Sequence, residues 1–477
     1  MRELCEQAVA AALGAGASYA DARVIVRRSQ VVGTRNRRVE RLDDVESEGI
    51  GVRVLVDGAW GFACDRRLDT AGAETAATKA SAFARAAPGG HSRALAKLRP
   101  AQGEYRTALE KDPFAVSLAD KIDLCLRAER ALEHKDVTVA TASVRAQREH
   151  RVFVSSDGVA TDQELVECGG GIDAFATRDG ITQIRSHPSA HGGSSAQAGW
   201  EYVESLELER EAPRVGEQAA ALLHADLCPS QVTTVVIDAE QMELQVHESV
   251  GHPTELDRVY GTEAAYAGTS FLGPEDLGSL RYGSEHMNVT ADSTTPGGLG
   301  TFGFDDEGVP ARREPVVAEG VLRNFLTSRE TAARIGSGAG GSMRADGWSR
   351  MPLVRMTNLH LEPGEGSLEE LIAGVDDGVF LQTNKSWSID DKRLNFQFGT
   401  QIAWEIKGGQ LGRMLRDATY TGQTPEFWGS LDAVAGPEEW VLQGLTNCGK
   451  GQPGQHAHVS HGAAPARFRN VQVGFGS

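Results

Sequence analysis

A run of strand-like segments between about residues 136 and 187 constrains the fold of this chain more than any other feature. The segments are rich in apolar and β-branched residues, and the pairs Asp157-Gly158 and Asp179-Gly180 separate them. Such residues favour extended backbone, and Asp-Gly pairs favour the tight turns that join antiparallel neighbours. The stretch therefore predicts an antiparallel meander.

Segments with helical spacing accompany this meander in the first half of the chain. Residues 2–14, the alanine-rich residues 69–86 and residues 117–134 each predict a helix. Residues 52–63 contain two apolar runs around Asp57-Gly58, which predicts a further hairpin. Helices combined with antiparallel strands in this way are typical of the α+β class.

The second half of the chain is dominated by strands and turns. It opens with a buried strand predicted at 233–238, which a helix follows, and it continues with extended segments at 354–363 and 400–418. With 477 residues the chain is too long for one ordinary core. We predict two domains, a mixed helix and antiparallel-strand domain over residues 1–228 and a β-rich domain over residues 229–477.

Charge and cysteine content narrow the functional classes. The formal net charge of −18 argues against nucleic acid or an anionic membrane as the main partner, because phosphate binding needs a basic surface. Six irregularly spaced cysteines without a C-x-x-C pair indicate a reducing compartment. The N-terminus lacks the basic stretch of a signal peptide, and no segment approaches the roughly 20 apolar residues of a membrane helix. We expect a cytoplasmic protein.

The strongest local signal is the hexapeptide His247-Glu248-Ser249-Val250-Gly251-His252 in the predicted C-terminal domain. Asp238 is the expected N-cap of the helix that leads into it, and Gln241 completes a capping box. Apolar residues recur every four positions along this helix, at Met242, Val246 and Val250. His247 is therefore expected on a helix that runs towards Gly251.

The spacing of the two histidines requires a distorted helix. Histidines four residues apart share one face of an α-helix and bind zinc together, whereas five residues turn about 500°, or about 140° net. His252 lies between Gly251, which tolerates unusual dihedrals, and Pro253, which disfavours α geometry in the residue before it. We predict a helix end or a π-type bulge at residues 250–252.

Glu248, directly after the first histidine, suits the role of a general base. Zinc lowers the pKa of a bound water to about 7, and a carboxylate within hydrogen-bond reach can take the proton of that water. The same carboxyl group can then deliver the proton to the leaving amine of a cleaved amide.

Two histidines do not complete a catalytic zinc site, which takes three protein ligands and a water. Cys448, beside Gly449, is one candidate for the third ligand. The other candidates are a downstream cluster of histidines and two acids near the motif, namely His456, His458, His461, Glu255 and Asp257. The spacing does not choose among these residues.

A second acidic group, Asp305-Asp306-Glu307, lies farther along the chain. It can form a second cation site or a turn before Gly308, and we expect the turn.

Taken together, the motifs of the second half resemble the TldD/PmbA family of metallopeptidases. HESVGH resembles the H-E-x-x-x-H motif of that family, and three further blocks follow in the family's order: residues 304–310, residues 352–358 and the tail NCGKGQPGQ at 447–455. Several blocks in order are far more specific than any one of them. The resemblance spans essentially the C-terminal half, and the N-terminal half is similar in layout.

The resemblance implies a zinc ion held by His247, His252 and Cys448, with Glu248 as the catalytic residue. It also implies a dimer that encloses a hollow interior, formed with a second copy or with a related sister subunit that lacks the motif. Because this chain keeps the motif, it resembles the metal-bearing, TldD-like subunit. Members of the family cut unstructured peptides that bind by strand pairing.

Three functions are therefore open at this point. The first is a zinc peptidase that acts on unstructured or modified peptides. The second is a zinc-dependent amide hydrolase that acts on a small metabolite or a natural-product intermediate. The third is a non-catalytic binding subunit with a structural metal, against which the intact Glu248 argues because a structural site needs no base.

Overall fold

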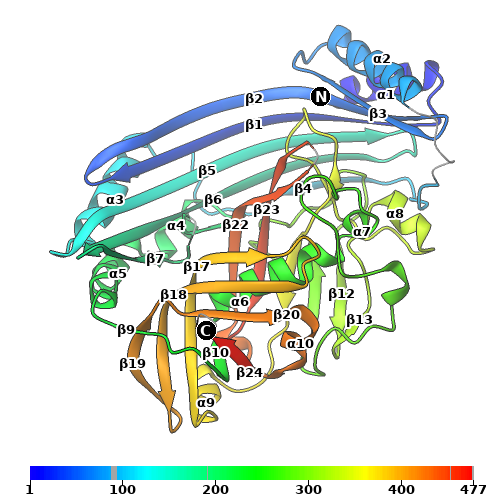
Figure 1. Ribbon diagram of the computed structural model, residues 1–477. Coiled ribbons are helices and arrows are strands. Elements are labelled where there is room, and N and C mark those ends of the chain that lie inside the picture. The colour runs from blue at the N-terminus through cyan, green and yellow to red at the C-terminus, as the bar shows by residue number, and fades with distance from the viewer. Residues whose placement is uncertain (88–93, 191, 452, 475–477) are drawn as a thin grey trace.

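The computed structural model describes residues 1–477 apart from 88–93, 191, 452 and 475–477. Figure 1 shows a long, curved sheet from the first half of the chain lying across a β-rich part built from the second half. The α+β class predicted from the sequence is confirmed. Of the helices in the described part, none is long and apolar enough to cross a membrane.

The N-terminal sheet has the strand order β3-β2-β1-β5-β6-β4, and β7 and β8 also pair with β6. All of its pairs are antiparallel except β4 with β6. The meander predicted over residues 136–187 corresponds to β5, β6 and β7, and the predicted hairpin to β2 and β3. The strands are β1 (Tyr19–Arg35), β2 (Arg38–Val56), β3 (Ala59–Asp65), β4 (Gln102–Arg106), β5 (Val137–Ser155), β6 (Ala160–Arg178), β7 (Ile181–His187) and β8 (Ser194–Ala196).

Helices cover one face of this sheet at both of its ends (Figure 1). The first pair packs on Val24, Val52 and Val152, and the second group packs on Val32 and Val144. Val24 and Val32 of β1, and likewise Val144 and Val152 of β5, are separated by an even number of positions. In a pleated strand, residues at such a separation point to the same face. The first pair is α1 (Arg2–Gly14) and α2 (Thr70–Ala86), and the second group is α3 (Leu118–Ala131), α4 (Trp200–Ser205) and α5 (Leu208–Leu222).

The opposite face of the sheet carries buried arginines that pair with the C-terminal half. Asp306 pairs with two of them, at 2.7 Å from Arg151 and 3.4 Å from Arg23, and Glu307 lies 3.1 Å from Arg53. The acidic group Asp305-Asp306-Glu307 therefore joins the two halves. Asp305 itself closes a turn by accepting backbone N–H groups from residues 307 and 309, which supports the predicted turn over a second cation site.

Five strands of the second half close into a barrel in the order β17-β10-β24-β20-β18, because β17 also pairs with β18. β19 and β9 extend this barrel beyond β18, and β21 pairs with β24. These elements are β9 (Asp226–Leu227), β10 (Gln231–Ile237), β17 (Asp377–Ile389), β18 (Asn395–Lys407), β19 (Gln410–Arg416), β20 (Thr419–Gln423), β21 (Leu431–Val434) and β24 (Ala466–Val473), with the helices α9 (Leu368–Ala373) and α10 (Thr424–Gly429).

A second sheet of the C-terminal half has the order β13-β12-β11-β16-β23-β22, and helix α6 (Ala239–Val246) contacts both this sheet and β17 of the barrel. One large apolar core includes residues from α6, the barrel and this sheet. The remaining elements are β11 (Val289–Asp292), β12 (Arg313–Ala318), β13 (Val321–Leu322), the pair β14 (Met343–Arg344) and β15 (Leu353–Val354), β16 (Asn358–Leu361), β22 (Val441–Lys450), β23 (Gln455–Ala463), α7 (Leu256–Val259) and α8 (Arg329–Arg334).

The division of the chain at residue 228 stays a prediction. Cys228 lies in the short link between β9 and β10, and β9 already pairs with β19 of the C-terminal half. The two parts are therefore joined by strand pairing just before residue 228 as well as by the buried ion pairs described above.

Candidate metal centre

Helix α6 begins as its cap predicts. The carboxylate of Asp238 accepts a hydrogen bond from the backbone N–H of Gln241 at 3.0 Å. The reciprocal half of the predicted capping box is not present, because the backbone N–H of Asp238 donates to the carbonyl of Leu381 instead. The predicted apolar stripe is confirmed, since Met242, Val246 and Val250 are all fully buried.

The helix changes its period at the first histidine. His247–Gly251 form a π-helical turn, closed by a hydrogen bond from the backbone N–H of His252 to the carbonyl of His247, and a 3₁₀ turn follows at His252–Thr254. In a π turn residues i and i+5 lie one turn apart, as i and i+4 do in an α-helix. The bulge predicted from the spacing is therefore present, and it places both imidazoles on one side of the helix.

The physical cause of the bulge differs from the predicted one. His252 has φ −62° and ψ −42°, so Pro253 does not turn it away from helical dihedrals. Gly251 is also right-handed, with φ −60° and ψ −63°. A glycine is needed here for space instead, because a Cβ atom at this position would lie 2.0 Å from the sulfur of Met356.

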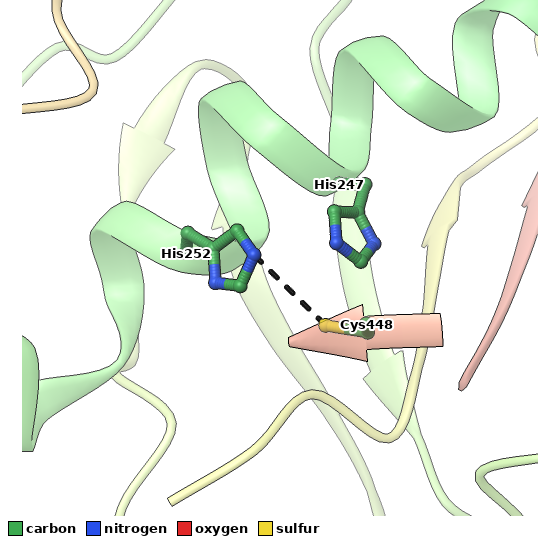
Figure 2. A group of neighbouring side chains, drawn as sticks. All are labelled: His247, His252 and Cys448. Atoms are coloured by element: carbon green, nitrogen blue, oxygen red, sulfur yellow. Dashed lines mark hydrogen bonds between the residues drawn. The ribbon is translucent and has the colours of Figure 1, made fainter. Parts of the chain in front are cut away.

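Three side chains converge beyond this turn, as Figure 2 shows for His247, His252 and Cys448. One ligand atom from each lies within 4.8 Å of the others, and Nε2 of His252 is 3.9 Å from Sγ of Cys448. All three residues are buried, with at most 4% of their surface exposed. In the described residues this is the only group of at least three such side chains that could hold a metal ion.

A hydrogen-bond chain sets which nitrogen of His247 is available to a metal. Nδ1 of His461 lies 3.0 Å from the carbonyl oxygen of Leu359, which can only accept, so this nitrogen carries the proton. Nε2 of His461, in the neutral ring, is then an acceptor and lies 2.7 Å from Nδ1 of His247. His247 therefore donates through Nδ1 and keeps the lone pair of Nε2 for a metal.

His252 is oriented in the same sense by a carboxylate. Its Nδ1 lies 3.0 Å from Oε2 of Glu255, and the carboxylate accepts the proton of that nitrogen. Nε2, the nitrogen nearest to Cys448, is left with its lone pair. Burial lowers the pKa of both His247 and His252, although Glu255 partly offsets this effect at His252. Both rings are thus held in the neutral form that binds metals.

The pKa of Cys448 on β22 is lowered from its ordinary value. Burial by itself raises the pKa of this thiol, but the opposing effects of its neighbours outweigh burial, and the guanidinium of Arg355 is the largest of them. Thiolate sulfur and imidazole nitrogen are the preferred ligands of zinc, and donors in a tetrahedral zinc site lie about 3.3–3.6 Å apart. The donor set therefore fits a zinc ion with one position left open, and the three side chains would draw closer than their present 4.8 Å span to hold it.

Glu248 lies in the π turn and points its carboxylate to Arg393. Its Oε2 accepts a hydrogen bond of 2.6 Å from Nη1 of Arg393, which belongs to the turn between β17 and β18. Both side chains are largely buried. Sequence reasoning missed Arg393, because it lies 145 residues from Glu248 and stands in no recognisable motif.

The structure separates the other candidates for a third ligand from the site. His456 is exposed, and Nδ1 of His458 pairs with Glu167 of the N-terminal sheet. His461 hydrogen-bonds to His247 and Glu255 to His252, and Asp257 lies 2.8 Å from Nζ of Lys450.

Comparison with known proteins agrees with this geometry. A family model described as the PmbA/TldA metallopeptidase C-terminal domain matches residues 230–474, the model for domain 1 matches residues 20–84, and the model for the central domain matches residues 111–227. Fold and site thus define a metallopeptidase. The chain belongs to the PmbA/TldD family and is a metalloprotease.

Curated relatives match along nearly the whole chain. A metalloprotease of Synechocystis is 30% identical over 466 residues, covering 94% of each protein, and a metalloprotease of Methanocaldococcus jannaschii is 28% identical, covering 94% of this chain and 95% of that protein. A zinc metalloprotease TldD homolog of Saccharolobus solfataricus is 25% identical over 245 residues, half of this chain.

Solved structures share the fold at lower identity. A Thermotoga maritima protein described as a modulator of DNA gyrase superposes with a TM-score of 0.76 at 20% identity, covering 99% of each chain. TldE from Thermococcus kodakarensis superposes with a TM-score of 0.74 at 15% identity, covering 99% of this chain and 100% of that chain. At such identities the likeness supports the architecture alone.

Proposed function

We propose that this metalloprotease is a zinc peptidase that hydrolyses unstructured or modified peptides. The observation that carries the proposal is the convergence of one ligand atom each from His247, His252 and Cys448 within 4.8 Å of one another. Hydrogen bonds to Nδ1 keep the Nε2 lone pair of each ring free for a metal. A zinc metalloprotease among the relatives supports the choice of metal.

In this proposal His247, His252 and Cys448 hold the metal and Glu248 is the general base. Zinc, when bound, lowers the pKa of a water to about 7 and polarises the amide carbonyl. Glu248 takes the proton of the attacking water through its carboxylate and delivers that proton to the nitrogen of the leaving amine. Arg393 keeps the carboxylate of Glu248 in place through its 2.6 Å ion pair.

We also propose that the substrate is cut inside a chamber enclosed by a dimer. Residues 1–228 would form the enclosure and the dimer contact, and residues 229–477 would carry the chemistry. The second subunit is another copy of this chain or a sister subunit of similar length without the two-histidine motif. Light scattering of the purified chain, alone and with such a sister, measures this; a monomer under both conditions contradicts the chamber.

The catalytic assignment is tested with Glu248→Gln, measured on a quenched fluorescent peptide that has no stable structure. We expect the variant to keep its zinc and to lose 10²–10⁴-fold in kcat, the usual contribution of a general base. Cys448→Ser should lose zinc, as measured by metal analysis. Full activity of the first variant would remove Glu248 from the mechanism, and full zinc content of the second would assign the third ligand elsewhere.

A further inference from the structure

A small cavity lies beside the metal centre, along the face of α6 that bears His247. Its volume is about 50 Å³, and its walls include α6, β17, β22, β23 and the Ser189-Ala190 segment. A single water needs about 10–15 Å³ on this measure, so the cavity has room for a few waters or for the polar end of one side chain.

Helix α6 lines this cavity with two acids and one metal ligand. Glu240, Glu243 and His247 are spaced three and four residues apart, which places them on one face of the helix. At 1.5 Å per residue, Glu243 lies about 6 Å and Glu240 about 10 Å from His247 along the axis. One extended peptide residue spans about 3.3–3.6 Å, so Glu243 lies within one or two residues of a bond placed at the metal.

Three polar atoms around this cavity lack hydrogen-bond partners among the residues that the structure describes. Glu243 is only 8% exposed, and its Oε1 accepts no hydrogen bond. Oε2 of Glu240 and Oε1 of Gln443 are buried without a partner as well. Unsatisfied buried acceptors are costly and uncommon in folded proteins. Three such acceptors around one small cavity therefore point to a ligand that donates hydrogen bonds.

No internal cation neutralises these acids among the residues that the structure describes. Glu240 and Glu243 form no ion pair there, and neither does Asp238 at the start of the helix. Arg185 acts on Glu240 only from a distance, because its guanidinium donates to Gln218 and Gln401. Burial raises the pKa of Glu243 well above its ordinary value, and burial together with Asp238 raises the pKa of Glu240 to about 8.

We infer that this cavity is a substrate subsite that binds a positively charged group of the peptide, an ammonium or a guanidinium, next to the bond to be cut. Such a group only donates hydrogen bonds and carries the charge that the cluster lacks, so it satisfies Glu243, Glu240 and Gln443 together. The cation comes from a lysine or arginine side chain or from the N-terminus of the peptide. The inference rests on the proposed peptidase function.

The test uses unstructured fluorogenic peptides that carry arginine or citrulline at one position, moved along the sequence, with a free or an acetylated N-terminus. Citrulline keeps the shape of arginine without its charge. We expect the zinc-loaded wild type to prefer the cation at least tenfold in kcat/KM at one position within two residues of the cleaved bond. A preference of the same size for the free over the acetylated N-terminus, with arginine and citrulline peptides cleaved alike, would instead identify the bound group as the N-terminal ammonium.

Equal cleavage of all these peptides would overturn the subsite and leave the peptidase function standing. Cleavage of none of them by the zinc-loaded protein would overturn the proposed function and the subsite with it.

The variant Glu243→Gln tests the residue that the inference depends on. It keeps the size of the side chain and removes the charge, so we expect the arginine-to-citrulline ratio to fall below twofold, mainly through KM. Glu438→Gln makes the same change at an exposed position and should keep the ratio. Should Glu243→Gln fail to fold, Glu240→Gln replaces it. An unchanged ratio in a folded, zinc-containing variant of either residue would overturn the inference.

Discussion

Two buried acidic clusters flank the metal-site helix, and they differ in whether a buried lysine neutralises them. On the His252 side, Nζ of Lys450 lies 3.2 Å from Glu255, 2.8 Å from Asp257 and 3.2 Å from Glu263, and Arg258 lies 3.4 Å from Glu263. Burial raises the pKa of Glu255, but Lys450 and His252 outweigh burial and hold that pKa well below its ordinary value.

On the His247 side the acids Asp238, Glu240 and Glu243 have raised pKa values, and His247 is oriented by a neutral histidine instead of a carboxylate. One cluster is thus neutralised by a buried lysine and orients His252. Among the described residues, the other cluster keeps unpartnered acceptors beside the candidate metal centre. Four substitutions test this contrast.

The largest effect is expected for Lys450→Met, which leaves three buried carboxylates with Arg258 alone. Removing one partner of a buried ion pair costs about 3–5 kcal/mol, because the remaining charge stays buried. Urea unfolding of the zinc-free variant should show this loss, and its zinc content should fall because Glu255 no longer holds His252. A loss below about 1 kcal/mol would mean that Lys450 does not neutralise this cluster.

His461→Phe should lower zinc affinity by about 10–100-fold, or about 1.4–2.7 kcal/mol, because the residues that orient metal ligands contribute this much. Phenylalanine keeps a ring in place but removes the acceptor for Nδ1 of His247. Competition with a zinc chelator measures the change. His458→Phe on the same strand is the control, since His458 pairs with Glu167. Equal affinity of the His461 variant and the wild type would show that His247 needs no such partner.

Glu240→Gln should change the pH dependence of stability. In the wild type the folded state keeps the proton of Glu240 up to about pH 8, whereas the unfolded chain loses it near pH 4.5, so the contribution of this group is present at low pH and is lost as the pH rises. The wild type should therefore lose up to about 1.4 kcal/mol per pH unit relative to the variant across this window. Denaturant unfolding between pH 5 and 8.5 measures the difference.

The charged groups that act on Glu240 are Asp238, Glu243 and Arg185, and all three are the same in the wild type and in the Glu240→Gln variant. For the exposed substitution Glu438→Gln, the difference in unfolding free energy from the wild type should not vary with pH. If this difference does not vary with pH for Glu240→Gln either, Glu240 is ionised in the folded protein.

The smallest effect is expected for Lys407→Met, which breaks the pair of Lys407 with Asp377 at 2.8 Å. Both side chains are more than half exposed, and exposed ion pairs contribute at most about 1 kcal/mol. The measured change in unfolding free energy should lie within that limit. A loss as large as that of Lys450→Met would contradict the view that burial separates the two kinds of ion pair.

Local patterns in the sequence predicted many elements closely. The helices expected at 2–14 and 69–86 are found at Arg2–Gly14 and Thr70–Ala86, because amphipathic spacing and capping act within a few residues. The alternation of apolar and polar residues at 22–28 predicts a strand, and the strand found there is longer, at Tyr19–Arg35. Its polar positions pair with distant charges, as Arg23 does with Asp306, and such pairs leave no periodic apolar signal.

Residues from about 203 to 225 predict one helix, but the structure has two helices in this region, α4 and α5. Glu207 lies between them with φ 48°, a left-handed conformation that interrupts the helix. Closure of the barrel could not be predicted either, since it depends on the pairing of β10 with β17, segments about 140 residues apart. Pairings at that separation are decided by packing rather than by local preference.

Residue order alone contains the hexapeptide with its two histidines, and it predicts the bulge between them and the family resemblance. Helical period and steric limits are local, so residue spacing is enough to derive the bulge. Three features follow from the fold instead: Cys448 rather than His461 approaches both histidines, His461 and Glu255 hold the two rings, and Lys450 neutralises one of the two acidic clusters. These outcomes depend on distances across strands and helices far apart in the chain, which folding sets through the burial and pairing of whole elements.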